Sequence, residues 1–108
     1  MPRYLVQGAI TKEGIREALS KHKGTGMRTL VTKFIESAGG KLESVFFAFG
    51  PYDTVGIAEF PDNASAAAIS VAARGAGLNN LTMTPLLTPE EMDRAVEKSA
   101  MLAVPTQR

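Results

Sequence analysis

Phe47-Ala48-Phe49-Gly50-Pro51-Tyr52-Asp53 is the stretch of sequence that decides the fold. The glycine, proline and aspartate in it are strong turn formers, and the residues on either side are apolar and β-prone. The pattern predicts a β-hairpin with arms at Leu42–Phe49 and Thr54–Phe60. The turn of this hairpin carries the phenol of Tyr52 and the carboxylate of Asp53.

A strand and two helical segments are expected before the hairpin. Arg3–Ala9 is a short β-prone run that predicts the first strand. Thr11 suits the N-cap of a helix that Lys21–Gly26 interrupts or ends, because each glycine in that segment costs about 1 kcal/mol inside a helix. A second helical stretch ends at Gly39 and Gly40. Its apolar stripe has helical spacing and consists of Met27, Leu30, Val31, Phe34, Ile35 and Ala38.

A helix, a strand and a final helix are expected after the hairpin. Ala64–Arg74 is rich in alanine and predicts a helix, with Asp62 or Asn63 as its N-cap. Leu78–Leu87 predicts the last strand. Thr88–Glu91 then opens a C-terminal helix, because it combines an N-cap threonine, a first-turn proline and two acidic residues at the positive end of the helix dipole.

The order of these elements is β-α-β-β-α-β-α. This order predicts an α+β, ferredoxin-like βαββαβ fold, with a four-stranded antiparallel sheet, helices on one face and an additional C-terminal helix. At 108 residues the chain is expected to form a single domain over residues 1–108.

Apolar side chains are expected on both faces of the sheet. In the second strand, simple alternation gives two apolar sets, Val45, Phe47 and Phe49 on one face and Leu42, Phe46 and Ala48 on the other. In the third strand, Val55 and Ile57 oppose the small residues Gly56 and Ala58. Because an apolar open face needs a cover, we expect a second copy of the chain to lie on it. The alternative is that the C-terminal helix folds back over the open face within one chain.

Composition narrows the classes of function. The net charge is +1, from 12 basic and 11 acidic residues, so we expect no nucleic-acid partner. The chain has no cysteine and one histidine, which leaves no basis for a disulfide, a thiol nucleophile or a metal site, and no cofactor is expected. The N-terminus lacks an apolar signal core and no apolar run could span a membrane, so a cytoplasmic protein is expected.

Three parts of the chain offer polar chemistry, each with a structural alternative. Tyr52 and Asp53 could bind a ligand or move a proton, or they could simply form the turn. His22 is the default general base, because histidine titrates near neutral pH, but it also suits a solvated surface. Lys23–Arg28 could bind an anion such as a nucleotide phosphate, or could be a plain loop between helices.

The chain resembles the GYD-domain family along most of its length. The segments that carry the resemblance are Pro2–Gly8, Gly39–Ser44, Phe47–Asp53, Pro61–Ala66 and Thr84–Met92. The resemblance implies a ferredoxin-like domain similar to the dimeric α/β-barrel group, with a pocket near the sheet, and it implies no particular reaction. The Gly-Tyr-Asp signature is interrupted here, because Pro51 separates Gly50 from Tyr52.

Two main functions are compatible with the sequence. The first is a homo-oligomeric ligand-binding or structural domain without catalytic machinery, either a homodimer or a higher homo-oligomer formed through the open sheet face. The second is a cofactor-independent enzyme of the dimeric α/β-barrel type, acting on a small and perhaps aromatic substrate. The candidate ligand-binding residues are Tyr4, His22, Phe46, Tyr52 and Asp53.

Overall fold

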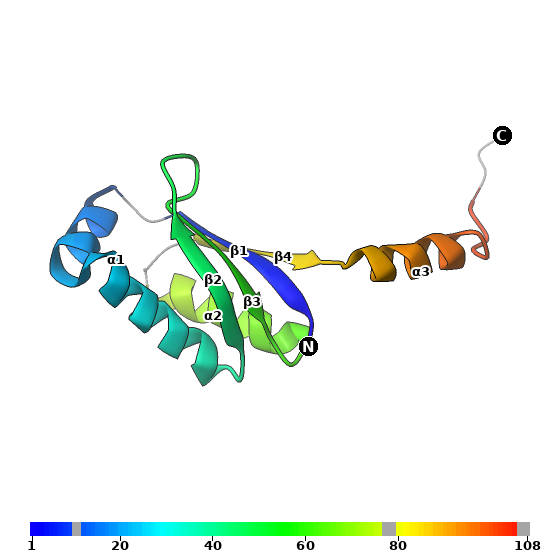
Figure 1. The fold of residues 1–108 in the computed structure, drawn as a ribbon, viewed down its shortest axis with the longest axis horizontal. Helices are drawn as coiled ribbons and strands as arrows, with labels where there is room; N and C mark the ends of the chain where they lie inside the picture. Colours follow the sequence, from blue (N-terminus) through cyan, green and yellow to red (C-terminus); the bar gives the residue numbers. More distant parts are fainter. Residues whose placement is uncertain (10–11, 77–79, 106–108) are drawn as a thin grey trace.

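The computed structural model describes residues 1–9, 12–76 and 80–105 (Figure 1). Its elements, in chain order, are β1 (Arg3–Ala9), α1 (Lys12–Ser37), β2 (Lys41–Phe47), β3 (Thr54–Glu59), α2 (Asn63–Gly75), β4 (Asn80–Leu86) and α3 (Pro89–Ser99). The predicted N-cap Thr11 and the predicted strand start at Leu78 lie outside the described residues.

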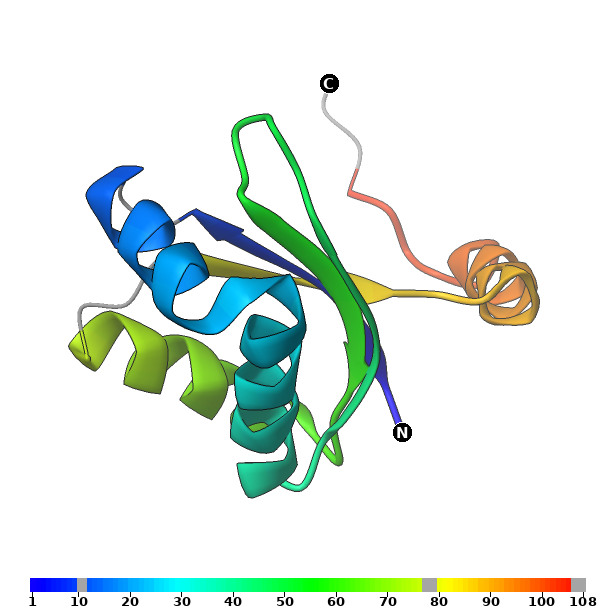
Figure 2. The same cartoon turned by 60° about the vertical axis from the view of Figure 1, so that its left-hand side comes forward.

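The four strands form one antiparallel sheet in the order β2-β3-β1-β4. Helices α1 and α2 lie together on one face of this sheet, and α3 lies apart from both (Figures 1 and 2). This is the α+β, ferredoxin-like arrangement that the sequence predicts. None of the described helices is long and apolar enough to cross a membrane.

The buried core lies between the sheet and the two covering helices. Ile35 of α1 and Ile69 of α2 pack there against Phe60, which follows β3 and is fully buried. The ring of Tyr4 meets Phe60 edge to face, with 5.6 Å between ring centroids. The Tyr4 hydroxyl donates a hydrogen bond to Oδ1 of Asn63 at the start of α2. One end of the sheet is therefore closed by well-packed side chains.

A β-bulge in β2 changes which of its residues share a face. Leu42 pairs with Ala58 and Ser44 pairs with Ile57, so one extra residue lies between them on β2. Leu42 consequently shares the helix-covered face with Val45, and the prediction that it lies beside Phe46 is wrong. The bulge also brings the Ser44 carbonyl oxygen close to β3, where a Cβ at Gly56 would lie 2.6 Å from it.

The first helix is kinked at one residue and continues beyond it. Lys23 has φ 59° and ψ 178°, a backbone conformation that is strained for any residue except glycine. The predicted interruption at Lys21–Gly26 is therefore a kink, and Gly24 and Gly26 lie inside the helix. The break in the helix is present at Lys23, and helical backbone resumes after it, so anion binding by Lys23–Arg28 stays a prediction.

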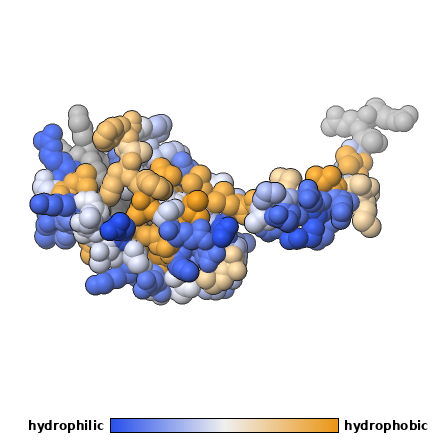
Figure 3. Space-filling model, in the orientation of Figure 1, coloured by the Kyte–Doolittle hydropathy of each residue, from blue (hydrophilic) through white to orange (hydrophobic). Residues whose placement is uncertain are grey.

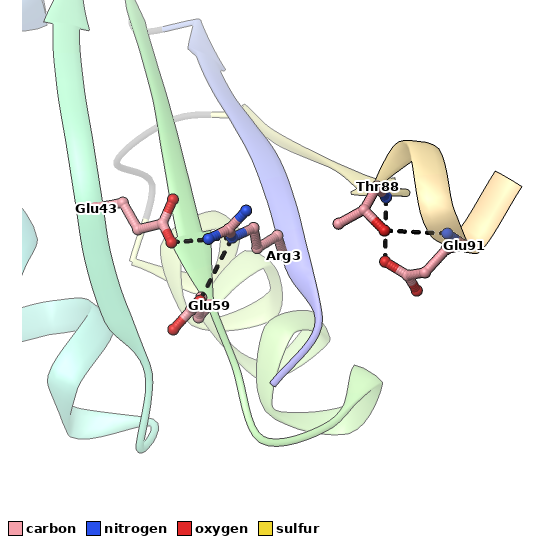
Figure 4. Close-up of polar contacts among 5 residues, drawn as sticks. All are labelled: Arg3, Glu43, Glu59, Thr88 and Glu91. Atoms are coloured by element: carbon pink, nitrogen blue, oxygen red, sulfur yellow. Dashed lines mark hydrogen bonds and ion pairs between the residues drawn. The ribbon is translucent and has the colours of Figure 1, made fainter.

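The other two helices begin with the caps that the sequence predicts. The Asp62 carboxylate accepts a hydrogen bond from the Ser65 backbone N–H, which lowers the pKa of Asp62. Thr88 and Glu91 form a reciprocal capping box, shown in Figure 4. The hydrogen bond from the Thr88 backbone N–H lowers the pKa of the Glu91 carboxyl. Local sequence signals thus set where α2 and α3 start.

The last helix extends away from the rest of the molecule (Figures 1 and 2). It buries none of its residues, and the chain measures 57 × 32 × 24 Å. The radius of gyration of the chain is 17.1 Å, whereas a compact chain of this length has a radius of gyration of about 13 Å. The alternative that the C-terminal helix folds back over the open face of its own sheet is therefore wrong.

Candidate functional site

An apolar cavity of about 450 Å³ lies between α1 and the covered face of the sheet. Val6, Val45 and Gly56, which are paired neighbours on three adjacent strands, line its sheet side. Ile69 of α2 lines it beside the core. Leu30, which also lines it, is 45% exposed, so the cavity opens to solvent along α1.

The kink allows two faces of α1 to line the same cavity. Before the kink, Gly14, Ala18 and His22 face it at successive intervals of four residues, the spacing of one helix face. After the kink, the apolar stripe that begins at Met27 faces it as well. The small side chains of the first half leave the space that larger residues would fill. A Cβ at Gly24 would lie 3.3 Å from the Phe47 ring, so the kink packs tightly against the end of β2.

Two side chains give this cavity its polar character. Among the described residues that line it, His22 and Thr54 are the ones with polar side chains. His22 is half-buried and can donate or accept a hydrogen bond through its ring nitrogens. The arrangement suits a ligand with a large apolar body and one polar group.

The described part of the lining offers little for acid–base or metal chemistry. It contains no carboxylate that could work with His22 as an acid–base pair. Across the described residues, no three histidine, aspartate or glutamate side chains gather where they could hold a metal ion.

The five predicted site residues do not converge on one place. His22 lines the cavity. Tyr4 is 3% exposed and belongs to the packed core, and Phe46 lies on the open face with 66% of its surface exposed. Tyr52 and Asp53 lie in the hairpin turn, at the end of the sheet where β1 finishes. A ligand-binding role for each of the five stays a prediction.

The hairpin turn is tied to the sheet by backbone hydrogen bonds. The Asp53 N–H donates to the Gly8 carbonyl oxygen at 2.8 Å, and the Ala48 N–H donates to the Asp53 carbonyl oxygen at 2.9 Å. These two bonds between main-chain atoms hold the turn against the end of β1.

Several lining residues were not predicted as site residues from the sequence. Val6, Val45 and Leu42 line the cavity from predicted strands, and Met27 lines it from the predicted apolar stripe. The signal that could have found the cavity is the small residues at positions 14 and 18, on the same helix face as His22.

The opposite, open face of the sheet forms a second distinct surface. Leu5 pairs with Ile57 and Val55 with Phe46, so these four apolar side chains lie together on it. Hydrophobic residues gather over the middle of the body and the hairpin in Figure 3.

A charged cluster marks one end of the open face. The Arg3 Nε lies 3.0 Å from Oε1 of Glu43 and 3.4 Å from Oε1 of Glu59 (Figure 4). All three side chains are at least partly exposed, and such pairs contribute at most about 1 kcal/mol each. The cluster therefore bounds the apolar area more than it stabilises the fold.

Comparison with known proteins gives one family. The family model of the GYD domain matches residues 4–96, which span β1 to most of α3. No curated protein and no solved structure gives a significant match. The matched range contains every described residue that lines the cavity.

Proposed function

This protein belongs to the GYD domain family, and from that premise we propose that it is a homo-oligomeric domain that binds a small apolar molecule between α1 and the sheet. The observation that carries the proposal is the 450 Å³ cavity, whose apolar wall contains a single imidazole. This volume lies within the range of small-molecule sites, roughly 300–1,000 Å³.

The chemistry of the wall defines the class of ligand. An aromatic or aliphatic body would bury against Val6, Val31 and Leu81, which belong to three different elements. A single hydroxyl, carbonyl or carboxylate group on the ligand would pair with His22 near the kink. A highly charged or phosphorylated molecule does not suit this wall, because its charges would lose hydration without gaining partners.

Filling the cavity tests the binding proposal. We expect Ala18→Leu to weaken binding of the fluorescent dye 1-anilinonaphthalene-8-sulfonate by about tenfold or more, since the added side chain occupies the ligand's space. Ala67→Leu, at an exposed position of α2, is the matched control and should bind the dye like the parent protein. Equal dye binding by the two variants, with circular dichroism showing both folded, would overturn the cavity as the site.

The proposal of self-association is supported by the surface area of the chain. The chain exposes 7880 Å², whereas a folded monomer of 11.5 kDa exposes about 5,800 Å². The excess of about 2,100 Å² per chain is in the range that an obligate homodimer removes from each partner, roughly 1,000–2,500 Å². The open face, with Leu5, Phe46, Val55 and Ile57, is the surface that a second copy would cover first.

An enzymatic function is the second candidate, and one observation favours it. His22 is the one histidine of the chain and lies on the cavity, where it could take a proton from a bound molecule. Under this alternative, His22→Asn would keep ligand affinity within about threefold and abolish turnover. Under the binding proposal no turnover exists to lose, and the substitution changes affinity alone.

A further inference from the structure

Among the described residues, none buries the apolar side chains of the C-terminal segment. We call Leu87–Pro105 the arm; it consists of α3 and the residues on either side of it. Its large apolar side chains are each at least half exposed, and they are Leu87, Met92, Val96, Met101, Leu102 and Val104. Met92 and Val96 are four residues apart, so they share one face of α3. The view in Figure 3 shows a mostly hydrophilic side of α3 with hydrophobic residues at its border and beyond its end.

The arm needs contacts that its own chain does not supply. An isolated helix of 11 residues is marginal in water, because nucleation is costly and few hydrogen bonds follow it. The capping box and Pro89 help to start α3, but its apolar face gains nothing while it stays exposed. A surface that receives this face would stabilise the helix.

A group of exposed phenylalanines lies at the other end of the sheet. Phe46, Phe47 and Phe49 lie at the hairpin end, and Phe49 is fully exposed. The arm leaves β4 after Leu86, which pairs with Arg3 at the opposite end. Strands of seven residues separate the two ends by about 20 Å, so the arm points away from the phenylalanines of its own chain.

Charge makes the hairpin end a better match for the arm than another arm. Helix α3 carries four carboxylates and two basic side chains, a net charge of −2 (2 − 4). The hairpin end lies beside the kink of α1, because Gly24 approaches Phe47, and Lys21 and Lys23 are exposed there. Two arms side by side would place like charges together, whereas an arm over the hairpin end faces Lys21 and Lys23, two positive charges beside the Asp53 carboxylate of the turn.

We propose that the arm of one copy seats on the hairpin end of a second copy, with its Met92–Val96 face against Phe46 and Phe49. The arm leaves β4 and Phe46 lies on β2, at opposite edges and opposite ends of the sheet. A two-fold axis in the plane of the paired open faces, perpendicular to the sheet diagonal that joins these two corners, brings the arm end of each copy over the hairpin end of the other. The contact is then made twice and covers apolar side chains that face-to-face sheet packing leaves at the edges. This inference rests on the self-association proposed above and specifies its geometry.

Cross-linking in the full-length protein tests the arm contact, since the natural chain has no cysteine. A Val96→Cys chain is mixed with a Phe49→Cys chain, allowed to exchange subunits, and treated with a short bismaleimide. We expect mixed dimers that join one chain of each kind to predominate, as identified by intact mass spectrometry. The control replaces Val96→Cys with Lys98→Cys on the polar side of α3, and mixed dimers should fall by about tenfold.

Each other outcome contradicts the arm contact. If Val96→Cys chains link mainly to each other, the arms pair with arms. If light scattering gives a dimer and no mixed link forms, the arm contact is wrong while the self-association of the Proposed function stands. If the protein stays at 11.5 kDa, both are wrong. A second measurement uses Met92→Glu. We expect its dimer dissociation constant to be at least tenfold higher than that of the parent protein. Its melting temperature should equal that of the parent at concentrations where both proteins are dimers.

Discussion

The two faces of the sheet differ in the size of their side chains. A monomer would need its larger apolar side chains on the face that its helices cover, and on β3 they lie on the open face. On β3, Gly56 and Ala58 point towards the helices, whereas Val55 and Ile57 point to the open face. The larger side chains thus point away from the chain's own helices. The difference supports both proposals made above, a small molecule in the space beside the covered face and a second copy of the chain on the open face.

The largest expected difference in stability is between substitutions of Phe60, in the core, and Phe46, on the open face. Phe60 is fully buried, so Phe60→Ala should reduce the free energy of unfolding by about 3–5 kcal/mol. Phe46 is largely exposed on the open face, and Phe46→Ala should act mainly on association. Urea denaturation of both variants over a range of protein concentrations checks this. If both substitutions lower the free energy of unfolding by the same amount at every protein concentration, the two faces do not differ in this way.

The close approach at the bulge gives a second test on the covered face. Gly56→Ala places a Cβ about 2.6 Å from the Ser44 carbonyl oxygen, so the strands must shift. We expect a loss of about 1–3 kcal/mol, of the size found for overpacked interiors. Gly50→Ala is the control, since a Cβ at position 50 meets nothing within 4 Å. A Gly56→Ala protein as stable as this control would contradict the bulge register.

Relieving the backbone strain at the kink of α1 should stabilise the folded protein. Lys23 occupies a backbone region that costs non-glycine residues roughly 1–3 kcal/mol, so Lys23→Gly should raise the free energy of unfolding by about 1 kcal/mol. Thermal melting of this variant, beside Lys21→Gly in regular helix, measures the effect. The Lys21→Gly protein should be less stable than the parent. A fall in melting temperature for both variants would show that position 23 is not strained.

The smallest expected effect is the pH dependence of the α2 cap. Hydrogen bonding from Ser65 lowers the pKa of Asp62 below its ordinary value of 3.8, so its contribution is fully present above that pH. It is lost as pH falls below 3.8 through the lowered value in the folded protein. Asp62→Asn keeps a cap acceptor without this titration, so its melting temperature should fall less than that of the parent between pH 6 and pH 3. Identical falls in the melting temperature of Asp62→Asn and the parent protein would exclude a pH-dependent contribution from Asp62.

Elements set by local signals could be predicted from the sequence. The turn formers after Phe49 mark the hairpin, and Asp62 and Thr88 mark the starts of two helices because capping depends on neighbouring backbone groups. The apolar stripe that includes Phe34 and Ile35 identifies the half of α1 that packs on the sheet. These features need only a few consecutive residues to specify them.

Features that depend on distant contacts could not be predicted. The bulge that moves Leu42 to the covered face arises from its pairing with β3, and simple alternation cannot detect it. The cavity is lined by residues of α1, α2 and all four strands, which only the folded chain brings together. The sequence specifies a helix after Thr88, but the direction of the arm depends on contacts that are not local.

The central claim is that the open face is covered by a second copy, and the molar mass in solution tests it most directly. Multi-angle light scattering on the full-length protein at micromolar concentration should give about 23 kDa or a higher multiple of the 11.5 kDa chain. Phe46→Glu should shift that mass towards 11.5 kDa, because it places a charge in the apolar face. A parent protein that remains at 11.5 kDa at micromolar concentration would contradict the account.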